Sequence, residues 1–291
     1  MIEKEIGGNE QHIYLLPLAA GEFVRIVVEQ PAVDVVLEML KPDGQPLAEV
    51  NNYQQNEPEH LSLIAETGGV YQLKIRPADP GAARAGYKIR VEDRRAATPR
   101  DSQFVEAERK FSESTRLLLR GKPDSLPQAV ATYEAALQQW RELGERRQEM
   151  KTLIYLGVAH EKQNKFQRFI EFYLQALPIA RELGDRRFEG ISLSGAGWGW
   201  HSLGEYRKAL EYYRSALTIR QSLGIARELA QSLTAIALAH RNSALESAGL
   251  RSGARLLRTR AAILARDRQP RRRSENSQQS RPHLQSERRP E

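Results

Sequence analysis

QAVATYEAALQQWRELGERR (128–147), RFIEFYLQALPIARELGDRR (168–187) and KALEYYRSALTIRQSLGIAR (208–227) are three copies of one pattern, offset by 40 residues at each step. Aligning the copies superimposes a tyrosine, an alanine, a leucine and a glycine. The aligned columns are Tyr133, Tyr173 and Tyr213; Ala136, Ala176 and Ala216; Leu137, Leu177 and Leu217; and Gly144, Gly184 and Gly224. Periods of this size are typical of stacked helical hairpins rather than of one globular core. The copies therefore predict an α-helical solenoid.

Each unit is expected to contain two helices and a tight turn. A helix B covers residues such as 206–223, and the glycine after it can adopt the left-handed conformation that ends a helix. A helix A, such as 185–202, precedes the next helix B. The small Ala216 lets neighbouring helices approach, while Tyr213 and Leu217 fill the space between hairpins.

The units resemble tetratricopeptide repeats of the longer, forty-residue kind, over roughly residues 104–242. The matching positions are Leu156-Gly157 at the Leu-Gly pair of helix A, Ala209 at the opening of helix B, Tyr213 at its aromatic and Ala216 at its second small position. The departures are Phe169 at a small position, and His160, Trp200 and His240 where the family carries tyrosine. Phe169 predicts wider local packing, and the helix at 104–120 reads as an N-terminal cap.

The first 95 residues have a different period. Six short apolar runs lie between His12 and Val91, and several alternate in the way that half-buried strands do. One face is expected to carry Tyr71, Leu73 and Ile75, and that of a later strand Tyr87, Ile89 and Val91. Turn residues separate the runs, so a small antiparallel β-sandwich is predicted over 1–95. The tract 96–103 reads as a linker leading to a helix capped by Asp101 or Ser102.

The runs from GGNEQHIYLLPL to GYKIRVED resemble the bacterial pre-peptidase C-terminal type of β-sandwich, over residues 5–93 or so. This resemblance implies an accessory, non-catalytic module, often found on exported proteins. Proteins that combine such a sandwich with forty-residue repeats often continue into a caspase-like (CHAT) protease domain that uses a histidine and a cysteine. The chain contains no cysteine, so that activity cannot be carried over.

A peptide or protein ligand is expected on the concave side of the superhelix, where helix A residues point away from the hairpin core. By spacing, these residues are Lys151, Ile154, Val158, Glu161, Ser194, Trp198, His201, Thr234, Leu238 and Arg241. Trp198 is the expected anchor, because a partly exposed tryptophan supplies large contact energy. Alternatively, the glycines of GAGWGW (195–200) make space for two tryptophan rings in the core. The arginine pairs 146–147 and 186–187 read as solvated helix starts, with a phosphate or acidic-peptide role as the alternative.

No chemical motif supports an enzyme. The sequence has no Walker-type loop, HExxH, GxSxG or paired carboxylates, and His12 and His60 are isolated. We therefore expect no catalytic residue, no cofactor and no metal. The sequence contains no apolar run long enough to span a bilayer and begins without a signal peptide, which predicts a soluble protein, cytoplasmic by default.

The positive charge is concentrated at the end of the chain. Residues 251–291 contain 12 arginines, no lysine and 4 acidic residues, a charge of +8, whereas the other 250 residues sum to −1. We predict a disordered, arginine-rich tail over 245–291. A frameshift near 242–250 would explain it: a back-translation read one nucleotide later can yield DYYARAL, which parallels EYYRSAL at 211–217. The alternative is a tail that binds nucleic acid through phosphate neutralisation, although it has no aromatic residue for stacking.

The sequence thus predicts a multidomain β + α protein: a β-sandwich, a tetratricopeptide-type solenoid over 104–244 and the tail. Its function is expected to be that of a non-catalytic protein–protein interaction scaffold, from the front part of a longer bacterial protein. Two alternatives are a truncated regulatory part of a caspase-like protease signalling protein and a nucleic-acid binder through the tail. Without downstream repeats, an apolar face after His240 is expected to promote self-association.

Overall fold

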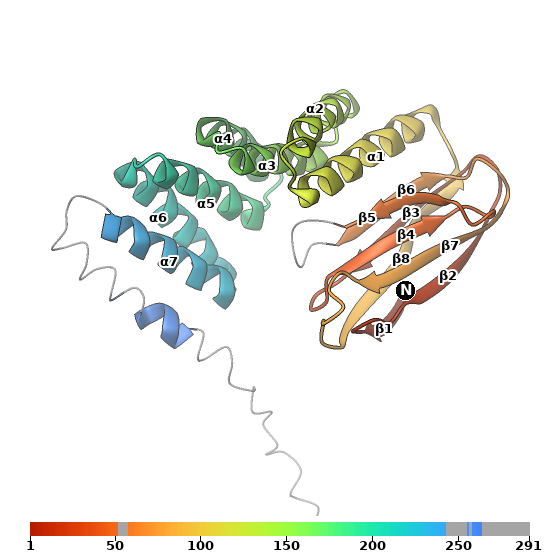
Figure 1. Ribbon diagram of the computed structural model, residues 1–291, viewed down its shortest axis with the longest axis horizontal. Helices are drawn as coiled ribbons and strands as arrows, with labels where there is room; N and C mark the ends of the chain where they lie inside the picture. Colours follow the sequence, from red (N-terminus) through yellow and green to blue (C-terminus); the bar gives the residue numbers. More distant parts are fainter. Residues whose placement is uncertain (52–57, 243–254, 256–257, 264–291) are drawn as a thin grey trace, which may run out of the picture.

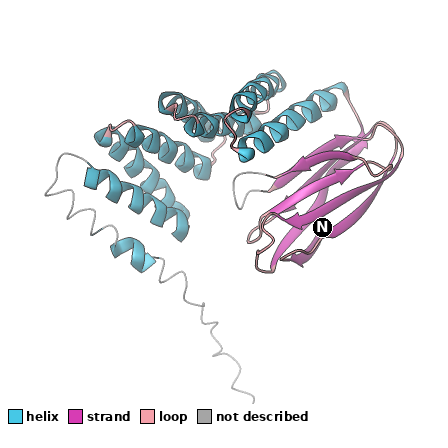
Figure 2. Ribbon diagram, viewed as in Figure 1, coloured by secondary structure: helices cyan, strands magenta, loops and turns pink. Residues whose placement is uncertain are grey.

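The computed structural model describes residues 1–51, 58–242, 255 and 258–263. Within these residues, eight strands are followed by the helices α1 to α7, and a short helical segment lies at 258–263 (Figures 1 and 2). The strands are β1 (Ile2–Ile6), β2 (His12–Leu18), β3 (Glu22–Glu29), β4 (Val35–Leu40), β5 (Pro46–Val50), β6 (Glu59–Ile64), β7 (Gly69–Pro77) and β8 (Ala85–Ala96). The helices are α1 (Pro99–Arg120), α2 (Ser125–Leu143), α3 (Arg146–Lys162), α4 (Phe166–Glu182), α5 (Arg186–Ser202), α6 (Tyr206–Leu223) and α7 (Ala226–Asn242).

The strands form two four-stranded antiparallel sheets, in the orders β1-β8-β3-β6 and β2-β7-β4-β5. Their facing sides make one core, in which Tyr71, Leu73 and Ile75 are at most 1% exposed. The expected alternation of β7 is confirmed, because burial of every second side chain is what selects this pairing register. Val91 departs from its expected face: it is half exposed, beside a register shift between β3 and β8.

Six expected strands became eight because the two additional ones are sheet edges. Strand β1 has one neighbour, β8, and strand β5 has one neighbour, β4. Most side chains of β1 are exposed, and β5 buries only Val50. These two strands contribute few core residues, so neither sequence carries a strong apolar alternation.

The connection between the sandwich and the helices is short. Helix α1 begins at Pro99, and Thr98 caps it: its side chain accepts from the Asp101 N–H while the Asp101 carboxylate accepts from the Thr98 N–H. The expected cap at Asp101 or Ser102 is therefore wrong. Pro99 suits the first helical turn because it needs no hydrogen-bond acceptor there, and this capping box places the start of the helix earlier. Arg95 of β8 pairs with Asp101 at 2.6 Å and ties the sheet to the helix.

The helices pack in sequence order, each against the next, and form an array that extends away from the sandwich (Figure 1). Gly144, Gly184 and Gly224 have φ values of 69°, 65° and 68°, the left-handed conformation expected at the ends of α2, α4 and α6. The observed helix at 206–223 has the predicted bounds. A helical repeat fold after a β region is thus confirmed.

The glycines of α5 make room for rings of the neighbouring helices rather than for the tryptophans beside them. A Cβ atom at Gly195 would overlap the Tyr173 ring of α4, and one at Gly197 would lie 2.7 Å from the Tyr213 ring of α6. A Cβ at Gly199 would meet Phe169 and Ile170. The expected wider packing at Phe169 is therefore avoided locally, because α5 presents a glycine where α4 presents the larger ring.

The paired arginines form ion pairs along the helical array. Arg146 bonds Glu182 and Arg147 bonds Asp185, each at 2.6 Å, while Arg187 lies 3.1 Å from Glu228. These are partly exposed pairs, individually worth about 0–1 kcal/mol. The Arg147 and Arg187 pairs bridge successive hairpins, whereas the Arg146 pair joins the two helices of one hairpin. These arginines therefore form ion pairs within the scaffold.

The arginine-rich region is largely outside the described residues, and so are the expectations of disorder, frameshift and nucleic-acid binding that rest on it. Arg255 and residues 258–263 are helical, so disorder is the wrong prediction for these few positions. Thr259 donates to the Arg255 carbonyl, an i to i−4 bond within that turn.

Candidate peptide-binding site on α5 to α7

Trp198 is the most exposed of the predicted concave residues with an apolar side chain, at 41%. Its indole Nε1 donates to Glu161 Oε1 of α3 at 2.8 Å. Its ring stacks on His201, with centroids 5.6 Å apart and planes inclined by 12°. Because the ring is held from two sides, it offers a contact surface with little rotamer entropy left to lose on binding.

His201 continues the arrangement toward α7. The amide Nδ2 of Asn242 donates to His201 Nε2 at 3.2 Å, and the Tyr206 ring meets the imidazole edge to face. Burial, together with the charge of Arg241, lowers the pKa of His201. The imidazole is therefore neutral at physiological pH and retains an acceptor nitrogen for Asn242.

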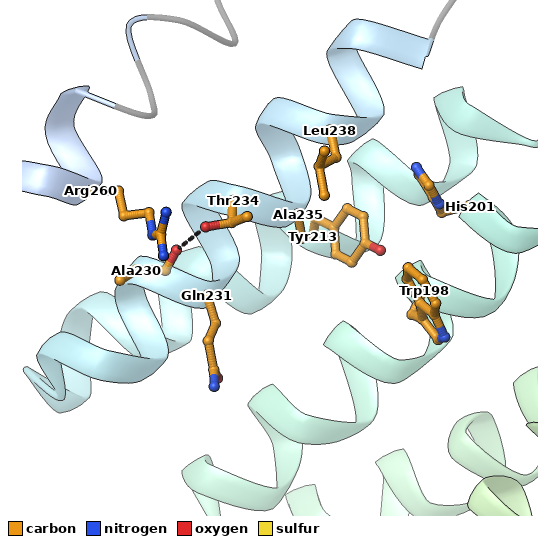
Figure 3. A pocket seen from close by; sticks show the side chains of 9 residues that line it. All are labelled: Trp198, His201, Tyr213, Ala230, Gln231, Thr234, Ala235, Leu238 and Arg260. Carbon is orange, nitrogen blue, oxygen red and sulfur yellow. Dashed lines mark hydrogen bonds between the residues drawn. The ribbon is translucent and has the colours of Figure 1, made fainter.

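A cavity of about 430 Å³ lies between these aromatic residues and α7 (Figure 3). Its lining is predominantly apolar and consists of Trp198, His201, Tyr213, Ala230, Gln231, Thr234, Ala235, Leu238 and Arg260. Pockets that combine an apolar lining with a few polar groups are the usual form of ligand sites. The cavity joins the tryptophan of one repeat to the helix A of the next.

Tyr213 contributes a hydroxyl group to the cavity wall. Its ring is 2% exposed, burial raises its pKa, and Figure 3 shows its hydroxyl directed toward the side of Trp198 and His201. No hydrogen bond joins this hydroxyl to any residue that the structure describes. A neutral phenol in this position can donate one hydrogen bond to a ligand and accept another.

The ten predicted residues divide into two groups. Trp198, His201, Thr234 and Leu238 line the cavity, and Glu161 reaches it through its bond to Trp198. Ser194 is half-buried on α5, and Arg241 is exposed on α7 next to Asn242, which it contacts at 3.4 Å.

Two of the four predicted α3 positions do not lie on an open groove. Ile154 is completely buried and Val158 is 8% exposed, so their expected position on an accessible face is wrong. The physical reason is that α3 is enclosed on every side: all residues from Thr152 to His160 are buried. Lys151 lies over the Phe188 ring at 5.9 Å, and its charge contributes, after burial, to lowering the pKa of His60 in the sandwich to about 4.

Tyr213, Ala230, Gln231, Ala235 and Arg260 were missed. On α7 the signal was available, because 230, 231, 234, 235 and 238 follow the i, i+3, i+4 spacing of one helix face. Tyr213 was assigned only to packing, although a tyrosine can present its ring to the core and its hydroxyl to a cavity. Arg260 follows a segment outside the described residues, and no pattern in the sequence places it here.

Trp200, two residues from Trp198, has the opposite role. It packs between the cores of the two adjacent repeats, and Lys208 lies over its ring at 4.4 Å. The two GAGWGW tryptophans therefore point to different surroundings, one toward the cavity and one toward the core. Among the residues that the structure describes, no cluster of three or more metal-ligating side chains occurs.

The fold and this cavity define the class: a helical repeat protein of the tetratricopeptide-like kind, preceded by a β-sandwich. Solved structures support the helical part. The apo form of RapI is 18% identical, with a TM-score of 0.50, over 56% of this chain and 57% of that one. BtubC (BKLC) from P. vanneervenii is also 18% identical with a TM-score of 0.50, over 65% and 78% of the two chains. Aspartyl phosphate phosphatase F from Bacillus subtilis is 14% identical, TM-score 0.51, over 58% and 42%.

These identities are low, so the likeness establishes the fold alone. The chain spans just over half of RapI. No protein-family model matches the chain, and no curated protein matches it in sequence. No helix within the described ranges combines the length and apolarity needed to cross a membrane.

Proposed function

We propose that the protein is a non-catalytic interaction scaffold that binds a peptide segment of a partner protein in the cavity of α5 to α7. The observation that carries the proposal is Trp198, which is 41% exposed yet fixed by Glu161 and His201 at the mouth of an apolar cavity. A protein gains little stability from holding an exposed indole in one orientation, whereas a binding site gains a pre-organised anchor.

The cavity favours a particular kind of peptide. Tyr213, Ala235 and Leu238 offer an apolar surface for one side chain, and the Tyr213 hydroxyl can bond a peptide carbonyl or amide. Arg260 lines the end of the cavity near Ala230, and the exposed Arg241 lies next to Asn242, which bonds His201. The Glu161 carboxylate accepts from Trp198. A segment with an apolar residue next to an acidic one would match the arginines.

The likeness to repeat proteins supports the scaffold class and leaves the partner open. The bacterial source, the relation to pre-peptidase C-terminal domains and to CHAT proteases, the absence of catalysis, and self-association through the last repeat remain proposals. For self-association, Leu233, Ile236 and Ala237 of α7 are each at most 5% exposed, so the expected open apolar face is not formed by these three residues.

The test is a pull-down with the full chain and with two single-residue variants of α5 and its cap. Trp198→Ala removes the anchor, and Leu203→Ala removes a comparably exposed apolar side chain, 44% exposed, outside the cavity lining. We expect a partner whose affinity falls by roughly 30-fold with Trp198→Ala, the size of a 2 kcal/mol hot spot, and is unchanged with Leu203→Ala. Equal recovery by Trp198→Ala and the parent chain would refute the site.

A further inference from the structure

A second and larger recess lies outside the α5 to α7 cavity, between helix α1 and the open side of the sandwich. Its volume is about 800 Å³. All five residues of β5 line it, together with the stretch from Leu61 to Ile64 of β6 and one side of α1. We refer to it as the α1 groove. Both strands are edges of their sheets, so the groove runs along two strand edges beneath a helix.

The outer edges of β6 and β5 differ in whether another part of the protein already covers them. Ser62 of β6 is opposite Arg25 of β3, and its N–H points outward and donates to Glu108 Oε2 of α1 at 2.7 Å. A side-chain carboxylate therefore occupies the position that a neighbouring strand's carbonyl would take. Phe104 of α1 also packs under the Arg25 guanidinium at 4.4 Å, so α1 closes this edge.

Strand β5 has no such protection. Its ladder with β4 uses one edge of the strand. Beyond that ladder, the backbone groups of residues 47–50 make no hydrogen bond with any residue that the structure describes. The other edge faces the groove. Unpaired edges normally attract a further strand unless they are covered, charged or bulged. An edge left open beneath a helix is the arrangement in which domains accept a peptide as an added strand.

The lining of the groove indicates which peptide would fit. Six glutamates line it against two arginines, a charge of −4 when every carboxyl is ionised; burial raises the pKa of one of them, Glu108, to about 7. Arg109 is already held between Glu106 and Glu113, and Lys41 and Lys74 pair with Glu66 and Glu38 from outside the lining. The carboxylate of Glu49, on β5 itself, has no ion pair with any described residue.

Between the glutamates the lining is apolar, from Leu47, Ala48 and Val50 on one side to Val105 on the other. The groove thus combines an open strand edge with apolar and acidic surfaces.

We propose that the α1 groove binds an extended segment of a partner protein, in which basic and apolar residues alternate, as an added strand on β5. The peptide backbone pairs with the free edge of β5. Because side chains alternate along a strand, the apolar ones lie beside Ala48 and Val50, which share one side of β5, while the basic ones lie beside Glu49 on the other side. This site is independent of the α5 to α7 cavity, so either can fail without the other.

The experiment measures fluorescence anisotropy of two labelled peptides with the full chain. The probes are a lysine–valine hexapeptide, acetyl-KVKVKV-amide, and its glutamate counterpart, acetyl-EVEVEV-amide. We expect the basic peptide to bind at least tenfold more tightly at low salt, with the difference reduced at high salt. Methylation of the edge-facing backbone nitrogens of the basic peptide should abolish binding, because a strand needs those N–H groups.

Two charge reversals locate the site. Glu49→Lys should weaken the basic peptide at least tenfold, whereas Glu3→Lys, an exposed charge on the remote edge strand β1, should leave binding nearly unchanged. Hydrogen exchange should slow at residues 47–50 when the peptide is present. Equal binding of the two peptides, equal effects of the two variants, or an unprotected β5 would each overturn the proposal. Concentration-dependent dimerisation that Glu49→Lys abolishes, without peptide binding, would assign the edge to a second copy instead.

Discussion

The sandwich and the solenoid build their cores in different ways. In the sandwich, residues distant in sequence pair directly: β1 lies beside β8, and His12 is opposite Ile75. In the solenoid each helix contacts mainly its sequence neighbours, and equivalent contacts recur 40 residues on. A closed core gains stability as a unit, whereas a solenoid adds nearest-neighbour interfaces. The two regions should therefore respond differently to substitution.

Truncating a core residue of the sandwich should produce the largest effect. Leu73 is completely buried at the centre of β7, and Leu73→Ala should cost about 2–5 kcal/mol of sandwich stability. All three tryptophans, Trp140, Trp198 and Trp200, lie in the helices, so tryptophan fluorescence follows the solenoid alone. In urea titrations, we expect Leu73→Ala to lower the urea concentration at which β7 loses its protection from hydrogen exchange. The midpoint followed by tryptophan fluorescence should stay unchanged.

Leu15→Ala is the matched control for this prediction. Leu15 lies on the same sheet but is 65% exposed, so its truncation should change stability by less than about 0.5 kcal/mol. If Leu73→Ala instead lowers the hydrogen-exchange and fluorescence midpoints together, the sandwich and the solenoid unfold as one unit, and the comparison between them fails.

The difference also explains how far the sequence could be interpreted. The helical repeat was predictable because one column pattern, Tyr133, Tyr173 and Tyr213, recurs at a fixed interval and each copy confirms the others. Strands β1 and β5 were not predictable, since they contribute little to the core and therefore carry little pattern. For the site, spacing identified Trp198 and Leu238 but not the burial of Ile154, because enclosure of α3 depends on several helices at once.

The junction between the two regions should depend on pH. Burial at the sandwich raises the pKa of Glu108 to about 7, and this desolvation outweighs the hydrogen bond from Ser62. The pKa of Glu108 is higher in the folded state than in the unfolded state. The destabilisation that its ionisation causes is therefore absent in acid and grows as the pH rises toward 7. We expect the free energy of unfolding at the junction to fall by about 2 kcal/mol between about pH 5 and about pH 8. Hydrogen exchange of β6 and α1 measures it.

Glu108→Gln should flatten this profile, because the amide still accepts from the Ser62 N–H and never ionises. Glu113→Gln, at a partly exposed position on the same helix, should preserve the pH dependence. Asp101 at the helix start does not interfere, since its pKa is lowered by the Arg95 hydrogen bonds and it titrates only in stronger acid. Parallel profiles for the parent chain and Glu108→Gln would mean that the Glu108 contact does not couple the regions.

The smallest expected effect concerns how closely the solenoid helices pack. Gly195 and Gly190 both lie in α5, and alanine at either would gain up to about 1 kcal/mol of helix propensity. At Gly190 the added Cβ would lie 3.5 Å from Ile219, an ordinary contact, so Gly190→Ala should be neutral or stabilising. At Gly195 it would overlap the Tyr173 ring, and overpacking costs about 1–3 kcal/mol, which leaves a net loss of about 1 kcal/mol. The urea midpoint of tryptophan fluorescence should therefore fall for Gly195→Ala and stay unchanged or rise for Gly190→Ala. A shared increase would mean that Tyr173 moves aside freely, and that the repeat spacing is set by the tyrosine column alone rather than by the glycines of α5 facing it.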